Sequence, residues 1–352
     1  MLLILFHHID YYGAFQEHTN NAINIVAYNI LRSVFMFSVN VFVLISAYFN
    51  VKTTGFKTRK LIRLWCEVAF YCLIIYLVTV LFFSEPFQIK EFLTCFLPIL
   101  FNKYWFFTAY FLLMLIAPFL NKILNNCSKK ECIILAVIIF VLGYCALRFP
   151  IDEKTVFCDG HNFIWLVCVY LIGGMLGLYP INLKRRYWFI IAFASVVLLV
   201  AEKYLYGVLP VWISAYIFNE FWYSYASPFV IVLSVSVFML FKDIDIKNVK
   251  IKKCINFISA STFGIYLFHM SIPFIYRLFF DVLGMQRYYD VSYNVLYVII
   301  YTFILFVMGL AIDLVRRLIF YYSEKGIDKL IINFKTKQKD QAKTTEKQID
   351  EH

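Results

Sequence analysis

Three histidines in apolar surroundings are the side chains of this sequence best suited to moving a proton. His7 and His8 lie together in the first apolar run, and His269 lies in a later one. An imidazole takes and gives a proton near neutral pH, which suits a general base. Adjacent residues on a helix point about 100° apart, so at most one of His7 and His8 faces a given site. The pattern leaves two interpretations open: a base, or a histidine that only hydrogen-bonds a neighbouring helix.

Two acidic residues also lie within apolar runs, where ionisable groups are costly and often functional. Asp313 is one helical turn from Arg316 and Arg317, and Glu67 is one turn after Arg63. Residues three or four apart are neighbours on a helix surface. We therefore predict local ion pairs for both acids.

The nine cysteines lie mostly in apolar runs and form no C-x-x-C pair. Cysteines in such surroundings usually act as small hydrophobic residues. We predict neither a metal site nor a redox role for them.

The elements that carry these residues are predicted to be membrane-spanning helices. The chain has 352 residues, of which 62% are hydrophobic and 16% are charged, against about 45–50% and about 25% in soluble domains. The apolar runs do not alternate with a period of two, which excludes a barrel and favours helices that satisfy their own backbone groups. We predict an all-α polytopic bundle of about ten spans. The spans are placed near residues 1–12, 33–51, 64–83, 104–123, 132–149, 162–180, 187–203, 225–242, 260–280 and 294–317.

The basic residues predict which side of the membrane each loop occupies. One alternating set of loops and the tail hold 25 of the 33 Lys and Arg residues. Cytoplasmic loops carry the excess of Lys and Arg, so both termini are predicted to be cytoplasmic. The net charge of +11 is therefore a topology signal, and its spread over five segments argues against a nucleic-acid partner. We also predict that Met1–Phe6 is not part of a cleavable signal peptide, because no basic lead-in or cleavage site is present.

An outer loop between Lys203 and Ser224 is rich in Tyr and Trp around Glu220. Such residues form aromatic belts at membrane interfaces. The alternative interpretation is a surface on which a sugar ring stacks.

An ordered series of motifs runs along the chain. The series consists of Met1–Gly13 with its paired histidines, Val39–Phe49, the basic stretch Lys57–Arg63, Tyr104–Tyr110 with Pro118, Trp165–Gly174, Tyr225–Pro228 and Ser261–His269. In order and spacing it resembles acyltransferase family 3, membrane-bound O-acyltransferases that modify sugars. The resemblance covers residues 1–320, and the polar segment 321–352 is predicted to be a cytoplasmic tail with a short helix followed by disorder.

The resemblance implies an O-acetyltransferase in the cell membrane. An acyl group, expected to be acetyl, would pass from acyl-CoA to a hydroxyl of a cell-surface polysaccharide or lipid-linked sugar. The donor is a substrate, and no permanently bound cofactor is implied.

The resemblance also implies roles for individual residues. His8 would be the catalytic base, and His269, Trp105, Tyr110 and Glu220 would bind substrate. Arg59 and Arg63 lie one helical turn apart on the predicted cytoplasmic side. Guanidinium groups bind phosphate through paired hydrogen bonds, so these two would hold the CoA phosphates. The alternative is that they serve only as topology signals.

Two positions depart from the family pattern. The family places an Arg ahead of the catalytic His with ten residues between them, and this position would precede Met1. We expect the coding sequence to begin upstream, the alternative being an inactive truncated remnant. Ala47 stands where the family has Gly, which would crowd a close helix approach.

A transporter or flippase of a lipid-linked sugar is the rival function. Such a protein would have ionisable pairs at mid-membrane and unwound helices in matching halves. The sequence has no such symmetry.

Overall fold

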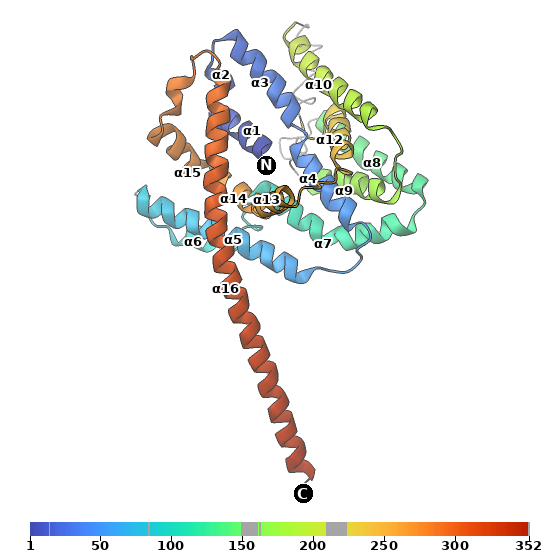
Figure 1. Ribbon diagram of the computed structural model, residues 1–352, viewed down its shortest axis with the longest axis vertical. Coiled ribbons are helices and arrows are strands. Elements are labelled where there is room, and N and C mark those ends of the chain that lie inside the picture. The colour runs from blue at the N-terminus through green and yellow to red at the C-terminus, as the bar shows by residue number, and fades with distance from the viewer. Residues whose placement is uncertain (14, 84, 149–160, 162, 209–223, 351–352) are drawn as a thin grey trace.

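The computed structural model of the protein describes residues 1–350 except 14, 84, 149–160, 162 and 209–223 (Figure 1). Every regular element in that part of the chain is helical, which confirms the all-α fold class. The elements are α1 (Leu2–Gly13), α2 (Phe15–His18), α3 (Ala22–Phe35), α4 (Ser38–Asn50), α5 (Thr58–Phe82), α6 (Ile89–Thr94), α7 (Trp105–Asn126), α8 (Lys129–Arg148), α9 (Phe163–Leu178), α10 (Arg185–Val208), α12 (Pro228–Phe241), α13 (Val249–Ser259), α14 (Thr262–His269), α15 (Ile272–Tyr276), the π-helix η3 (Arg277–Val282), the 3-10 helix η4 (Met285–Tyr288) and α16 (Val295–Asp350).

Fewer helices than predicted are long enough to cross a membrane alone. Five stretches of the described residues pass by length and composition, one of them being α3 and α4 taken together as Ala22–Asn50, and a sixth passes if one bent pair counts as a single span. α9 and α12 are apolar but have only 16 and 14 residues, whereas a span needs about 20. The protein is thus a helical membrane protein, and ten crossings remain a prediction.

The predicted span 260–280 is broken in the structure. α14 ends at His269, and the chain bends by 88° between Val249–His269 and Phe274–Phe280. Pro273 lies in this stretch, and proline removes a backbone donor and disfavours a continuous helix. The break places His269 at a helix end.

Helix α9 lies at the centre of one half of the bundle, packed against α4, α7 and α8. Its close approach to α4 depends on glycine. A Cβ at Gly173 would lie 2.8 Å from the Cβ of Ala47 and 2.8 Å from the carbonyl oxygen of Leu44. The methyl group of Ala47 is therefore accommodated, fully buried, because its partner has no side chain.

The other half is organised around the long helix α16. It packs against α1 and α14, and α14 also packs against α5 (Figure 1). α16 continues as one helix to Asp350 and extends beyond the bundle. The predicted short helix with a disordered tail after residue 320 is therefore wrong through Asp350. Lys and Gln, which are good helix formers, recur along this segment.

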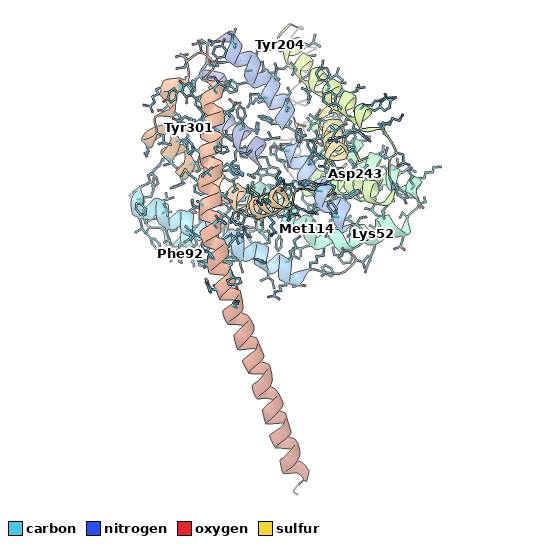
Figure 2. All side chains as sticks on the ribbon, in the orientation of Figure 1. Lys52, Phe92, Met114, Tyr204, Asp243 and Tyr301 are labelled. Atoms are coloured by element: carbon cyan, nitrogen blue, oxygen red, sulfur yellow. The ribbon has the colours of Figure 1, made fainter. Side chains whose placement is uncertain are left out.

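Three labelled residues show how the end of α10 lies relative to two basic loops. Tyr204 lies at the top of the view in Figure 2, whereas Lys52 and Asp243 lie lower on its right side. The sidedness of the termini stays a prediction.

Candidate active site

Two of the three histidines come together although 261 residues separate them in sequence. His8 Nδ1 in α1 lies 2.8 Å from His269 Nε2 at the end of α14. The two rings stack, with centroids 5.0 Å apart and planes inclined by 21°. His269 is buried, with 3% of its surface exposed. The arrangement is an imidazole pair that can pass or hold a proton.

The local sequence of each helix positions its histidine. Leu5, Phe6 and Ile9 are buried on α1 and hold this helix in the bundle. On α14 the Nδ1 atom of His269 lies 3.1 Å from the carbonyl oxygen of Ile265, one turn earlier. The orientation of the His269 ring is therefore set within its own helix.

Helix α14 is fixed against α5 and α16 by a buried charged network. Tyr71 donates a hydrogen bond to Asp313 at 3.0 Å, and Arg316 Nε lies 2.7 Å from the same oxygen, Asp313 Oδ1. Gly264 of α14 faces this oxygen so closely that a Cβ there would collide with it. The network thus places the backbone that carries His269.

The predicted local ion pair of Asp313 with Arg316 is confirmed. Glu67 pairs with the same arginine, its Oε1 lying 3.2 Å from Arg316 Nη2. Spacing along one helix indicates Arg63 for Glu67, and that pair stays a prediction. A partner on another helix cannot be read from such spacing.

His8 lines a cavity of about 210 Å³. The side chains around it are mostly apolar or aromatic, and they include Phe42, Trp105, Tyr225 and Tyr266. A few polar groups in an apolar pocket are typical of a small-molecule site. His8, and not His7, lines this cavity and contacts His269.

Next to the pair, a second group of polar residues joins α1 to α3. Asp10 Oδ2 lies 3.3 Å from Arg32 Nε, and the Arg32 guanidinium lies 5.9 Å from the centre of the Tyr11 ring. The His7 ring stacks on Tyr11 at 6.1 Å. The two neighbouring histidines thus have different surroundings, as their 100° separation predicts.

A second cavity of about 230 Å³ adjoins the first, because Phe42 and Phe263 line both. Lys57, Lys60 and Asn50 lie on its wall. Lys57 donates a hydrogen bond to Asn50 at 2.7 Å. The cavity therefore combines cationic groups with an apolar interior.

Polar residues inside the bundle shape this second cavity. The Tyr110 and Ser46 hydroxyls are 2.8 Å apart. Asn121 donates to the carbonyl oxygens of Asn50 and Thr53 at 2.9 and 2.6 Å, which holds the end of α4 and the following loop against α7. These bonds keep the loop before α5 folded over the cavity.

An aromatic cluster stands at the edge of the first cavity. The rings of Trp105 and Tyr225 each lie 4.7 Å from the exposed His161 ring, and they lie 6.0 Å from one another. Asn40 donates to the Tyr225 carbonyl oxygen at 2.9 Å and accepts from the Trp165 indole at 3.0 Å. The Asn40 bridge thus locks the position of Tyr225.

The structure brings some of the sequence-predicted residues together and separates others. His8 and Trp105 line the first cavity, and Tyr110 lines the second. His269 contacts His8 but lines neither of these cavities. Arg59 and Arg63 are exposed on α5 and are not among the residues that line them. Glu220 lies outside the described residues.

Sequence reasoning missed Lys57, Lys60 and Tyr225 as site residues. The two lysines belong to a basic stretch whose members all fit the topology signal equally well. Tyr225 belongs to the Tyr225–Pro228 motif, but no chemical feature distinguishes it from the many other tyrosines.

Comparison with known proteins supports the same family that the motifs resemble. The model of acyltransferase family 3, described as an acyltransferase domain, matches residues 1–313. No curated protein and no solved structure matches the chain. The matched region contains α1, α14 and both cavities. Because the match covers most of the chain, the protein belongs to acyltransferase family 3.

Proposed function

We propose that this protein is an O-acetyltransferase of the cell membrane that moves an acetyl group from acetyl-CoA to a hydroxyl of a cell-surface polysaccharide or lipid-linked sugar. The observation that carries the proposal is the His8–His269 pair beside a cavity that adjoins a lysine-lined one. A base next to two adjoining cavities suits a reaction in which two substrates meet. Membership of an acyltransferase family supports the class of reaction.

His8 is the proposed general base. A sugar hydroxyl is a weak nucleophile at neutral pH, and a positioned base contributes about 10²–10⁴-fold to such a step. The hydroxyl oxygen attacks the thioester carbonyl carbon while its proton passes to the His8 imidazole. The tetrahedral intermediate then breaks its C–S bond, and the thiolate takes the proton from His8. The products are the sugar ester and the CoA thiol, and His8 returns to its neutral form.

The donor is proposed to enter through the second cavity. Lys57 and Lys60 on its wall can attract the CoA phosphates, and its apolar interior suits the pantetheine arm. From there the thioester can reach His8 past the Phe42 and Phe263 rings that the cavities share. Arg59 and Arg63, one turn along α5, can add to the positive potential that draws the phosphates.

The acceptor is proposed to bind at the aromatic edge of the first cavity. Trp105, Tyr225 and His161 form a cluster against which the apolar face of a sugar ring can pack. The exposure of His161 leaves that edge reachable from outside the bundle.

The proposal is tested by acetyl transfer in membranes. Vesicles that contain the protein are given labelled acetyl-CoA together with the host's surface polysaccharide, and alkali-labile label on the polysaccharide is measured. We expect incorporation with the wild-type chain and at most a hundredth of that rate with His8→Ala. Surface polysaccharide from cells with and without the gene should differ in O-acetyl content. Equal acetylation in both cell lines, with no transfer in vesicles, would overturn the proposal.

A further inference from the structure

Both ring nitrogens of His269 have an assigned neighbour, and this determines where the hydrogens lie. His269 Nδ1 is 3.1 Å from the Ile265 carbonyl oxygen, which can only accept. His269 Nδ1 therefore carries the hydrogen. The ring is 3% exposed, and burying an unpaired charge is costly, so the ring is neutral and has one N–H. Its Nε2 atom is consequently an acceptor.

The position of the hydrogen on the His8 ring follows from its contact with His269. Its Nδ1 atom lies 2.8 Å from His269 Nε2. Since His269 Nε2 accepts, His8 Nδ1 must donate and must carry the hydrogen of the His8 ring. A neutral His8 then has its lone pair at Nε2. The chain of bonds Ile265 C=O, His269, His8 thus selects one of the two tautomers of His8.

We propose that His269 is a positioning residue that holds His8 in the tautomer whose Nε2 atom takes the proton of the acceptor hydroxyl. The proposal rests on the proposed function of His8 as general base. In other enzymes a group that binds the Nδ1–H of a catalytic histidine has this effect, and loss of the correct tautomer in a serine protease lowers kcat by about 10⁴-fold. Here the orienting group is a second imidazole, itself oriented by a backbone carbonyl.

The position of α14 adds to this constraint. Gly264, five residues before His269, packs against Asp313, which Tyr71 and Arg316 hold in place. Helix α14 therefore cannot slide along α16 without disturbing buried charged groups. The accepting nitrogen of His269 is thus held at a fixed point relative to α1.

The tautomer can be measured without any assay of activity. The full-length protein in lipid, labelled with ¹⁵N-histidine, gives ring-nitrogen signals that distinguish bare from protonated nitrogen. The chain has six histidines, and single His→Gln variants assign them. We expect His8 to show a protonated Nδ1 and a bare Nε2. A bare Nδ1 with a protonated Nε2 in the wild-type protein would overturn the proposal.

Two variants of His269 test the consequence for turnover. Phe at this position fills the space but cannot accept, whereas Gln offers an oxygen near the place of Nε2. We expect His269→Phe to lower kcat about 10²-fold or more with the donor KM within twofold, and to give both tautomers of His8. We expect His269→Gln to retain a larger part of kcat. His18→Gln, at an exposed position on α2, is the matched control.

The outcomes separate this inference from the proposed function. Unchanged kcat in His269→Phe would overturn the positioning role while leaving His8 as base. Absence of acetyl transfer by the wild-type chain would overturn the function, and the nitrogen signals would still decide the tautomer. If His269→Phe does not fold, the wild-type signals and His269→Gln carry the test.

Discussion

The two histidines of α1 are neighbours in sequence but meet different partners. His8 contacts His269 and lines the first cavity, whereas His7 stacks on Tyr11. We therefore expect His8→Ala to lower kcat by about 10²-fold or more, because the base is lost. His7→Ala should retain most of the activity. The measurement is the initial rate of acetyl transfer in vesicles, with protein amount and thermal unfolding as controls.

Two results would contradict this assignment. Activity that survives His8→Ala but not His7→Ala would place the base one residue earlier. Activity in both variants would remove general-base catalysis from α1 altogether.

The charged residues before and in α5 divide into two pairs. All four side chains are exposed, but Lys57 and Lys60 line the second cavity whereas Arg59 and Arg63 do not. We expect the double change Lys57→Met and Lys60→Met to raise the donor KM about tenfold, the value of one charge-assisted hydrogen bond. The double change Arg59→Met and Arg63→Met removes the same charge and is the matched control. Donor saturation curves give both values, and a larger effect of the arginine pair would move the phosphate site to α5's exposed face.

The residue types of the candidate site could be predicted, but their partners could not. Histidines in apolar runs stand out by chemistry, and the family motifs indicated His8 in particular. The contact of His8 with His269, by contrast, depends on how α1 and α14 meet on α16. The contact of Glu67 with Arg316 is a similar case, because Arg316 lies on a different helix.

At the scale of elements, the contact between α4 and α9 allows the packing of two helices to be tested, because glycines of α9 lie against the backbone of α4. Gly173 meets Ala47 and Leu44, and a Cβ at Gly177 would lie 2.9 Å from the Tyr48 carbonyl oxygen. Small residues four apart let two membrane helices approach closely. We expect Gly173→Ala to destabilise the protein by about 1–3 kcal/mol, because backbone atoms have to move apart. Thermal unfolding in detergent measures the change.

Gly55→Ala is the control for this prediction, since nothing lies within 4 Å of its added Cβ. Equal unfolding temperatures for the Gly173 and Gly55 variants would contradict the close approach of the two helices.

Hydropathy predicted the existence of the helices well and their breaks poorly. Apolar runs indicate where a helix forms, because an unsatisfied backbone is too costly in lipid. The division of residues 260–280 into α14, α15 and η3 was missed, although Pro273 signals a break. Its consequence is functional, because the end of α14 is where His269 meets His8.

At the scale of the whole molecule, composition predicts about ten spans, and five or six stretches of the described residues are long and apolar enough to cross a membrane. α9 is buried along most of its length and is apolar on all sides. A helix inside a bundle and a helix in lipid have the same composition, so a hydropathy pattern cannot separate them.

The roles proposed for the two cavities require a defined orientation in the membrane. The basic loop that carries Lys57 and Lys60 should face the cytoplasm, where acyl-CoA is present, and the segment that carries His161 should face outward. The split of Lys and Arg between the two sets of loops, 25 of 33 in one, predicts this orientation. Reporter fusions after Phe241 and after Arg317 should therefore read cytoplasmic, and a fusion near Lys203 should read external. Alkaline phosphatase and a fluorescent protein, which are active on opposite sides, give independent readings at each site. A cytoplasmic reading at Lys203 would put the aromatic edge on the donor's side, and the acceptor would then have to be a cytoplasmic sugar.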